Sequence, residues 1–213
     1  MQAATPVTLI ETAEDLAKAA HWLAEQEPRF ATVLDQTGPL PLRRIPAGFA
    51  ALLDIVMSQQ VSVASASAIW QRLENAGLTE PAPLAAATAE DLRACGLSRQ
   101  KIRYAQALAA NPPDFDVLAG ASDAALVAGL TALPGIGRWT AEVYGMFALG
   151  RADIFAAGDL ALQEAARLVF DLPARPDEKT LRRMAEDWSP WRAVAARALW
   201  AYYRHAKQRE GIL

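Results

Sequence analysis

The spacing of apolar side chains is the feature that most narrows the fold of this 213-residue chain. In segment after segment, apolar residues return every three or four positions, the period that gives an α-helix one buried face. The segments predicted to be helical are 12–26, 49–57, 66–73, 88–96, 98–110, 122–130, 138–149, 160–170, 177–187 and 190–208. Strand-like alternation is confined to two or three residues around Ile154. The predicted fold class is therefore all-α.

Start signals support several of these boundaries. Thr88, followed three residues later by Asp91, has the form of a capping box, in which side chain and backbone satisfy each other's hydrogen bonds. Ser98 and Ser122 stand where a helix N-cap is expected. Residues 28–47 are rich in proline and glycine, so this stretch is predicted to be irregular.

Composition excludes several kinds of site. The single cysteine, Cys95, can form neither an internal disulfide nor a four-thiolate iron–sulfur site, and we expect it to be a small buried side chain. The two histidines, His21 and His205, lack the spacing of metal ligands. The chain opens without the pattern of a secretion signal, and no apolar run reaches the ~18 residues of a membrane span. We therefore expect a cytoplasmic protein that does not contact a membrane.

The charge balance limits how the chain can bind nucleic acid. A formal net charge of −3 argues against general coating of DNA or RNA, because neutralising many phosphates needs clustered cations. A protein that grips a few phosphates locally remains compatible with this charge. Many of the basic residues are arginines late in the chain, where they form either a solvated helix face or a local contact surface.

The most informative motif is the string LPGIGRWTAE at residues 133–142. Proline with Gly135 and Gly137 predicts a tight turn between two helices, and glycine allows another surface to approach the backbone closely. The first amides of the second helix lack intrahelical acceptors and lie at the positive end of its dipole, which suits a phosphate. The carbonyls of the turn are suited to a monovalent cation. The alternative is an ordinary glycine-rich corner between packed helices.

This string resembles the helix-hairpin-helix motif of the HhH-GPD superfamily of DNA repair glycosylases. In that superfamily the hairpin is followed, after a short apolar segment, by an essential aspartate. Residues 153–160 are similar to that segment, and they place Asp159 22 residues after Gly137. The resemblance implies that Asp159 is the catalytic carboxylate, while Asp153 caps a helix or faces solvent. An aspartate at position 159 would also be a normal N-cap for the helix that begins near Leu160.

The resemblance extends over most of the chain, from about residue 42 to residue 203. Segment 55–62 is similar to the glutamine-rich helix end that faces DNA in the superfamily. Segments 188–192 and 200–202 resemble the closing helices of the alkylpurine branch, the bacterial DNA-3-methyladenine glycosylase II type. The resemblance implies removal of alkylated purines, of the 3-methyladenine and 7-methylguanine type, in base excision repair. Trp139 stands where bifunctional members carry a lysine, which implies a monofunctional enzyme that uses water.

Three aromatic residues are candidates to line the pocket for the flipped base. Trp139, Trp200 and Tyr144 are implied by the resemblance, and an aromatic face attracts the positive charge of an alkylated purine. The family's own aromatic position is occupied here by Val143, beside Tyr144. The alternative for both tryptophans is packing in the core.

The resemblance also implies the residues that contact double-stranded DNA. Gln60 would fill the gap left by the flipped damaged nucleotide, and Gln59 would either contact a base edge or cap backbone groups. Phosphates would be held by Gly135, Gly137 and Thr140, mainly through backbone amides. The backbone carbonyls that would hold a sodium or potassium ion in the hairpin are those of Thr131, Leu133 and Ile136.

The resemblance further implies two helical lobes with a cleft between them. Residues 46–158 are predicted to form the central lobe, with the hairpin at 133–138, and residues 1–45 with 159–213 the second lobe. We expect a compact monomer without the extra N-terminal β domain of larger relatives. We expect it to act on DNA in the bacterial nucleoid. No cofactor is expected to be required for the chemistry.

Three alternatives remain open from the sequence. The first is a glycosylase for oxidised, mispaired or deaminated bases, although the lack of a lysine in the motif and of further cysteines argues against lyases and iron–sulfur relatives. The second is a non-catalytic module that binds DNA through the hairpin. The third is a helical interaction protein in which the glycine turn has no role in binding.

Overall fold

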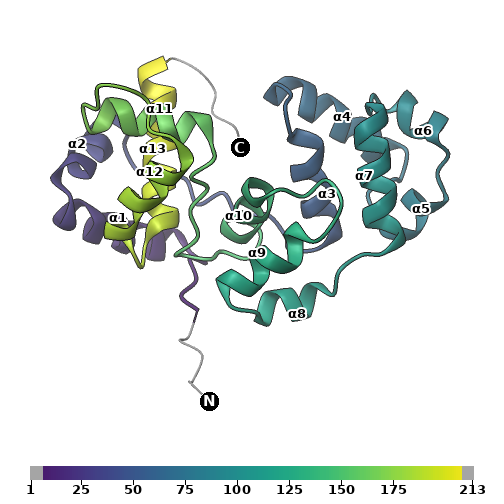
Figure 1. Ribbon diagram of the computed structural model, residues 1–213, viewed down its shortest axis with the longest axis horizontal. Coiled ribbons are helices and arrows are strands. Elements are labelled where there is room, and N and C mark those ends of the chain that lie inside the picture. Colours follow the sequence, from purple (N-terminus) through teal and green to yellow (C-terminus); the bar gives the residue numbers. More distant parts are fainter. Residues whose placement is uncertain (1–6, 208–213) are drawn as a thin grey trace. The chain divides into compact units, whose positions relative to one another are not determined.

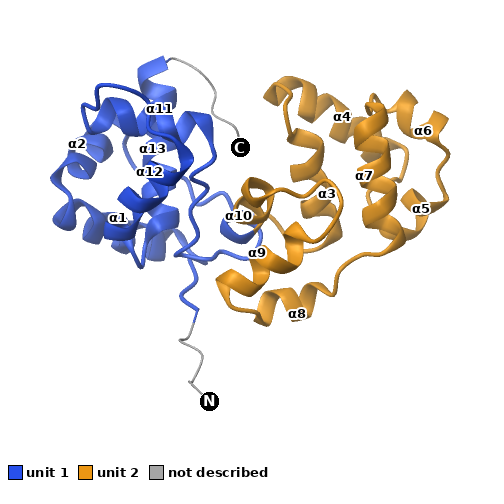
Figure 2. Ribbon diagram, in the orientation of Figure 1, with its two compact units in different colours: residues 1–44, 145–211, 213 blue, residues 45–144, 212 orange. Residues whose placement is uncertain are grey.

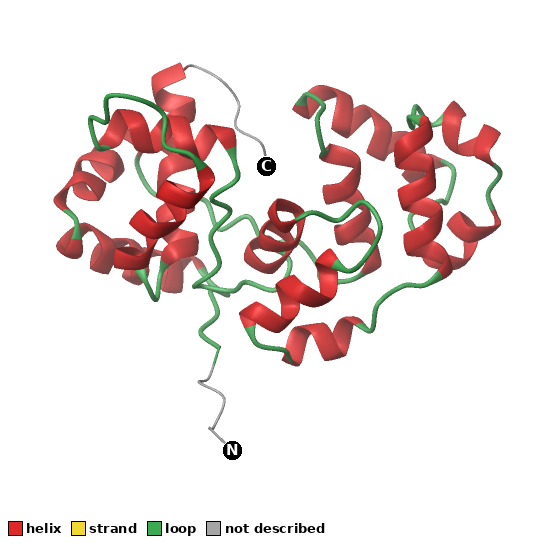
Figure 3. Cartoon of the chain, in the orientation of Figure 1, coloured by secondary structure: helices red, strands yellow, loops and turns green. Residues whose placement is uncertain are grey.

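The computed structural model describes residues 7–207, and helices and loops account for its architecture (Figures 1 and 3). The helices are α1 Ala13–Gln26, α2 Pro28–Thr37, α3 Phe49–Ser58, α4 Val63–Asn75, α5 Pro81–Ala86, α6 Ala89–Ala94, α7 Arg99–Ala110, α8 Phe115–Gly120, α9 Asp123–Thr131, α10 Arg138–Phe147, α11 Leu160–Val169, α12 Glu178–Met184, the 3₁₀ helix η1 Ala185–Trp188, and α13 Arg192–Lys207. Within residues 7–207 the β-type pairing is one isolated bridge between Leu9 and Arg151. The all-α prediction is confirmed. The same residues contain no helix long and apolar enough to cross a bilayer.

The predicted caps form as expected. The Thr88 hydroxyl oxygen accepts a hydrogen bond from the Asp91 amide, and the Asp91 carboxylate accepts one from the Thr88 amide, which completes the capping box of α6. Ser98 caps α7 and Ser122 caps α9 through their hydroxyl oxygens. Local polar chemistry therefore sets where these helices begin. Position 208, the last of the predicted final helix, lies outside the described residues.

The prediction of an irregular stretch at 28–47 is wrong in its first half, where α2 forms. Pro28 occupies the first position of α2, where its missing N–H costs no hydrogen bond. The helix ends at Gly38, whose φ of 72° suits glycine. Pro28 and Gly38 thus mark the start and the end of a helix and do not interrupt one. The short helix α5 begins in the same way at Pro81, and it was not predicted either.

The other differences concern short elements. Helix α8 was not predicted; Asp114 caps it by accepting hydrogen bonds from the Asp116 and Val117 amides, both at 3.0 Å. No strand forms around Ile154 in the described chain, so that weak strand prediction is also wrong.

The chain divides into two compact units (Figure 2). Among the described residues, unit 1 comprises 7–44 and 145–207, and unit 2 comprises 45–144. The predicted boundary at residue 158 is therefore wrong, because residues 145–158 belong to unit 1. Backbone hydrogen bonds explain the assignment: Ile10 donates to Gly150 at 2.7 Å, and Ala193 donates to Ala152 at 2.9 Å. The segment 145–158 is therefore hydrogen-bonded both to the N-terminal part of unit 1 and to the start of α13.

Unit 1 is built around α13, which packs against α11, α2 and α1. An aromatic cluster fills part of its core. The Phe30 ring lies 5.3 Å from that of Trp188 and 5.9 Å from that of Phe170, both edge to face, and Phe155 contacts Trp188 from a centroid distance of 5.5 Å. Such edge contacts add to the hydrophobic gain of burying the rings. The cluster fixes the segment that leads into α11.

Unit 2 is organised around α3, which packs against α4 and α7. Most of α3 is buried, namely Phe49, Ala51, Leu52, Leu53, Ile55, Val56 and Met57. A helix that is apolar on nearly all sides belongs inside a core. Because α3 is buried on nearly all sides, the position of the residues that directly follow it is well defined.

Removal of the Phe30 side chain should destabilise unit 1. Phe30 is fully buried in the aromatic cluster, so Phe30→Ala leaves a cavity and is expected to lower the free energy of unfolding by about 3–5 kcal/mol. Urea unfolding followed by tryptophan fluorescence measures this. Val117→Ala is the control, because Val117 is 67% exposed and its truncation should change the stability by less than about 0.5 kcal/mol. Equal effects of the two changes would contradict the described core.

Candidate functional site

The glycine string forms a tight turn between α9 and α10, as predicted. The Ile136 amide donates to the Leu133 carbonyl at 3.2 Å and closes the turn. The Ala141 amide donates to the Gly137 carbonyl at 3.1 Å, so the helical bonding of α10 starts at Gly137. The amides of the first turn of any α-helix have no intrahelical acceptor. The turn therefore presents a helix N-terminus with its positive dipole end.

The two glycines of the turn have different roles. Gly135 has a φ of +82°, and a Cβ at this position would lie 2.2 Å from a ring carbon of Tyr104. Gly135 is therefore required for the turn to pack on the Tyr104 ring. A Cβ at Gly137 would meet nothing within 4 Å, and Gly137 is exposed. Gly137 is the position where another molecule can reach the start of α10.

Gln59 ties the end of α3 to the hairpin. Its side-chain amide donates to the Gly135 carbonyl at 3.1 Å and to the Thr140 hydroxyl at 2.8 Å. Of the two predicted roles for Gln59, base contact or capping of backbone groups, the geometry supports the second. Thr140 as a whole is 1% exposed and its hydroxyl is bonded to Gln59, so its contact with a phosphate stays a prediction. No sequence pattern linked Gln59 to residues 76 and 81 positions later.

Gln60 follows immediately and is exposed. Its φ of 56° is left-handed, a conformation that costs a non-glycine residue about 1–2 kcal/mol. The neighbouring Lys101 ammonium donates to the Met57 carbonyl in the last turn of α3. Helix α3 thus ends at a fixed place, and a turn follows at Gln59 and Gln60. Strain of this kind is common where a side chain must be presented to a ligand.

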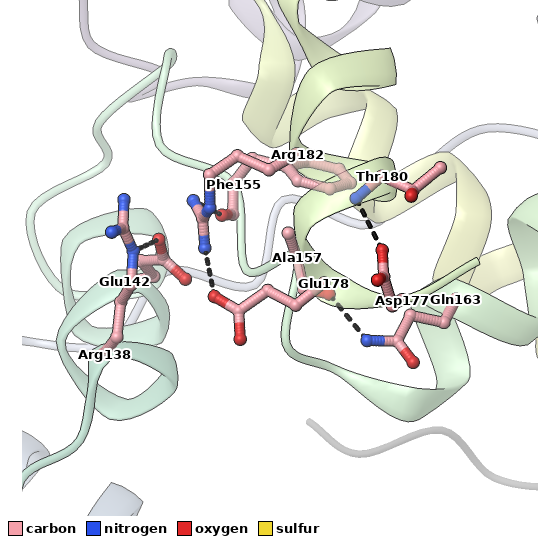
Figure 4. Close-up of polar contacts among 9 residues, drawn as sticks. All are labelled: Arg138, Glu142, Phe155, Ala157, Gln163, Asp177, Glu178, Thr180 and Arg182. Atoms are coloured by element: carbon pink, nitrogen blue, oxygen red, sulfur yellow. Dashed lines mark hydrogen bonds and ion pairs between the residues drawn. The ribbon is translucent and has the colours of Figure 1, made fainter.

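In the first turns of α10, Arg138 and Glu142 form an i, i+4 ion pair with an Nε–Oε1 distance of 2.9 Å (Figure 4). Glu142 is 2% exposed, so this ion pair holds a buried carboxylate at the start of α10. Trp139 lies between them in sequence and is half-buried. Core packing alone therefore does not account for this tryptophan.

Asp159 is the N-cap of α11 in unit 1. Its Oδ1 accepts hydrogen bonds from the Ala161 amide at 2.9 Å and from the Leu162 amide at 3.0 Å. The side chain is 3% exposed. The positive end of the α11 dipole favours a negative charge at this place. The carboxylate is consequently buried, oriented and electrostatically supported.

Trp200 on α13 contributes a third donor to the same oxygen. Its indole Nε1 lies 3.2 Å from Asp159 Oδ1, and its ring lies 5.7 Å from the ring of Phe147. Trp200 is 4% exposed. The sequence predicted Trp200 as a pocket residue and did not predict this hydrogen bond, which joins residues 41 positions apart.

The backbone before Asp159 is also held by side chains (Figure 4). The Gln163 side-chain amide donates to the Ala157 carbonyl at 3.0 Å, and Arg182 Nη1 donates to the Phe155 carbonyl at 3.3 Å. Arg182 is itself paired with Glu178 at 2.8 Å. These contacts restrict the loop that carries Asp159. The carboxylate is therefore positioned both by the loop before it and by the α11 amides after it. Neither contact is predicted from the sequence, where Arg182 is one of the late arginines and Gln163 belongs to no motif.

Asp153 has a structural role. Its carboxylate pairs with the Arg192 guanidinium through two contacts of 2.7 and 2.8 Å, and Ser189 donates to it at 2.9 Å. A two-point contact with arginine fixes both carboxylate oxygens. The prediction that Asp153 caps a helix or faces solvent is therefore wrong. Its carboxylate forms an ion pair with Arg192, which joins the segment before Asp159 to α13.

Tyr144 packs in the core of unit 2. Its hydroxyl accepts a hydrogen bond from the amide of Gly48, the residue directly before α3, at 3.1 Å, and its ring lies 6.2 Å from that of Phe115. Burial raises the pKa of the Tyr144 hydroxyl. These contacts give Tyr144 a structural role, and its contact with a base stays a prediction. Cys95 is buried, as expected.

The two units therefore offer different chemistry. Unit 2 presents an open helix N-terminus at Gly137 and an exposed side chain at Gln60, which suit an extended anionic ligand. Unit 1 holds a buried carboxylate whose orientation is fixed by three N–H donors. Among residues 7–207, no three histidine, cysteine or acidic side chains gather in a way that could hold a metal ion.

Comparison of the amino-acid sequence with known proteins identifies relatives of this chain. The profile of the HhH-GPD superfamily of base excision DNA repair proteins matches residues 53–190. The alkylbase DNA glycosidase-like protein mag2 of Schizosaccharomyces pombe is 27% identical over 87% of this chain and 93% of its own length. The DNA-3-methyladenine glycosylase 1 of the same yeast is 32% identical over 70% of this chain and 69% of its own length.

Solved structures agree with the sequence relatives. The S. pombe 3-methyladenine DNA glycosylase in complex with abasic DNA superposes with a TM-score of 0.80 at 27% identity, over 89% of this chain and 97% of that one. A DNA-3-methyladenine glycosidase from Bacillus halodurans superposes with a TM-score of 0.74 at 29% identity, over 96% of this chain and 94% of that one. The fold is thus shared along nearly the whole length of these proteins.

Addition of a methyl group at Gly135 should damage the hairpin. Gly135→Ala places a Cβ against the Tyr104 ring in a left-handed conformation, and it is expected to lower the free energy of unfolding by about 2 kcal/mol or more. Chemical unfolding monitored by circular dichroism measures this. Gly137→Ala is the matched control; the added methyl group meets open space, so a change of less than about 1 kcal/mol is expected. A loss of stability confined to Gly137→Ala would contradict the packing described.

Proposed function

We propose, from the premise that this chain belongs to the HhH-GPD superfamily of base excision DNA repair proteins, that it is a monofunctional glycosylase that removes alkylated purines from DNA. The observation that carries the proposal is the Asp159 carboxylate, held by two amides of α11 and the indole of Trp200. The relatives named as 3-methyladenine glycosylases supply the substrate class.

Asp159 acts by stabilising charge. Cleavage of the bond between base and deoxyribose builds positive charge on the sugar, and a fixed carboxylate lowers the energy of that state. Because three N–H donors already orient Asp159, little reorganisation is needed when the charge develops. The carboxylate also orients the attacking water, which forms the new bond to the sugar carbon and gives up one proton through Asp159 to solvent, while the base leaves with the electrons of the glycosidic bond.

The reaction ends at the abasic site. A glycosylase that also cleaves the strand needs an amine to attack the sugar carbon. The first turn of α10 carries Arg138, Trp139 and Thr140 after the hairpin, and none of them has such an amine. The enzyme is therefore a hydrolase without lyase activity.

The preferred substrates are purines made cationic by alkylation. A cationic base is already a good leaving group, so a rigid carboxylate suffices without a strong general acid. Aromatic faces attract such a base by up to about 2 kcal/mol when water is excluded. The half-buried Trp139 and the Trp200 ring are the residues proposed to contact it, and Tyr144 stays the third candidate.

DNA is held mainly by unit 2. The open approach at Gly137 and the amides at the start of α10, with Gly135 shaping the turn, are proposed to bind a backbone phosphate without requiring net positive charge. The exposed Gln60 is proposed to fill the space left when the damaged nucleotide flips out of the helix. The partner is double-stranded DNA with one damaged base. We expect a monomer that works in the compartment that contains the chromosome, the cytoplasm in a bacterium.

A monovalent cation in the hairpin is a further part of the proposal. The carbonyls of Thr131, Leu133 and Ile136 would hold it. Thr131 is the last residue of α9, where the negative end of the helix dipole favours a cation. The Leu133 carbonyl also accepts the Ile136 amide at 3.2 Å, so one lone pair of this oxygen is already used. The ion would steady the turn, and it would take no part in the chemistry.

Asp159→Asn should remove activity while preserving the protein. Asparagine accepts the same two α11 amides and is an equally good N-cap, so stability is retained. Loss of the negative charge is expected to slow base release by at least about 100-fold. The measurement is release of 3-methyladenine and 7-methylguanine from methylated duplex DNA in single-turnover reactions.

The outcomes of this experiment are distinct. Release by wild type alone supports the assignment of Asp159. Equal release by both proteins would show that another group is catalytic. If neither protein released methylated purines and both bound DNA, a panel of deaminated and oxidised bases would decide between another lesion and a non-catalytic binding module.

Trp200→Phe tests the third hydrogen bond to Asp159. Phenylalanine keeps an aromatic ring beside Phe147 but cannot donate to Asp159 Oδ1, so base release is expected to slow about tenfold. Affinity for DNA that already contains an abasic site should stay unchanged. Trp188→Phe is the control, because Trp188 is equally buried in unit 1 but lies in the aromatic cluster of Phe30. A similar slowing in both variants would indicate a general packing effect.

A further inference from the structure

Unit 2 contains a small pocket beside Gln60 that the proposed chemistry does not use. The pocket has a volume of about 250 Å³ and is lined by residues after α3 and by residues at the start of α7. It is slightly smaller than the ~300–1,000 Å³ typical of pockets for whole small molecules. Its size therefore suits a single ring system rather than a complete cofactor.

One wall of the pocket carries a lysine with spare donors. The Lys101 ammonium has three N–H donors, and among the described residues its partner is the Met57 carbonyl. No carboxylate of the described chain pairs with Lys101. Partial burial lowers the pKa of this amine below its usual value. The remaining donors of this half-buried ammonium are available to an acceptor that enters the pocket.

Tyr104, one turn after Lys101 on α7, gives the pocket an aromatic surface that is connected to the hairpin. Tyr104 lines the pocket, and its ring is the surface on which Gly135 packs. Its hydroxyl accepts a hydrogen bond from the Gln100 side-chain amide at 2.6 Å, which fixes the ring. Ile69 adds an apolar contact from α4. A flat, partly apolar ligand would therefore stack here next to the hairpin turn.

We propose that this pocket receives the undamaged base that stood opposite the lesion, after the damaged nucleotide has flipped. The inference rests on the proposed function, in which Gln60 fills the vacated space. The nearest neighbour of a side chain inserted there is the unpaired partner base, and Gln60 forms the rim of the pocket. Lys101 donates to that base, and Tyr104 contacts its face.

A base fits these walls better than a phosphate does. Every base carries an N3 or O2 acceptor at its minor-groove edge, so a lysine can bind any of the four. Aromatic stacking is likewise tolerant of base identity. A phosphate would gain nothing from Tyr104 and Ile69, and it would find one cation. The pocket therefore supports repair of damage within any sequence.

The test is a double-mutant cycle between Lys101 and the opposite base. Affinity is measured for two duplexes that carry a tetrahydrofuran abasic analogue, one with thymine opposite and one with a second abasic analogue opposite. Wild type is expected to bind the second duplex at least about fivefold more weakly, because Lys101 loses its acceptor. Lys101→Met is expected to discriminate between the two duplexes less strongly than wild type, because only the Tyr104 contact with the base remains.

Controls separate this contact from general electrostatics. Lys179→Met removes an exposed positive charge from unit 1, and it should preserve the discrimination of wild type. If Lys101→Met weakened both duplexes by the same factor and reduced the slope of log affinity against log salt by about 1, Lys101 would contact a phosphate and the proposal would be overturned. Absence of discrimination in wild type would overturn it as well, whatever the stability of the variant.

Failure of this inference is distinguishable from failure of the proposed function. Release of methylated purines is measured on the same wild-type preparation. Release without opposite-base discrimination would remove the pocket proposal and leave the enzyme activity standing. Discrimination without release would support the pocket and direct the search to another lesion.

Discussion

The hydrogen bonds between the α11 amides and Asp159 are the interaction on which the chemistry of unit 1 depends. Two amides of the helix turn a flexible acidic side chain into a fixed charge, and the Trp200 indole adds a contact from α13. The helix gains a cap and the site gains orientation from the same bonds. Because α13 is also the centre of the unit 1 core, the position of the carboxylate is coupled to the stability of the whole unit.

Local dipoles explain how an acidic protein can serve a polyanionic substrate. The chain carries a formal net charge of −3, yet the start of α10 offers an anion the positive end of a helix dipole, beside Arg138, whose charge is paired with Glu142. Such a site acts over a short range and reads no sequence. This is consistent with an enzyme that must inspect ordinary DNA without being retained by it.

Some features could be predicted from sequence because they depend on neighbours along the chain. The cap at Thr88, the turn at Gly135 and the cap at Asp159 are of this kind. The start of α2 at Pro28 was misread because proline both ends and begins helices, and sequence alone does not decide between the two. The bonds of Gln59 to the hairpin and of Trp200 to Asp159 join distant positions, so only the folded chain brings them together.

The left-handed backbone at Gln60 has a consequence for how such an enzyme can change over time. The direction in which this side chain leaves the protein is set by the buried helix α3 and the bend that follows it, rather than by the side chain itself. Replacement of the residue therefore changes what is presented while the place of presentation stays the same. Residues that tolerate a left-handed φ, such as asparagine, can replace Gln60 with little penalty to folding, whereas β-branched residues cannot.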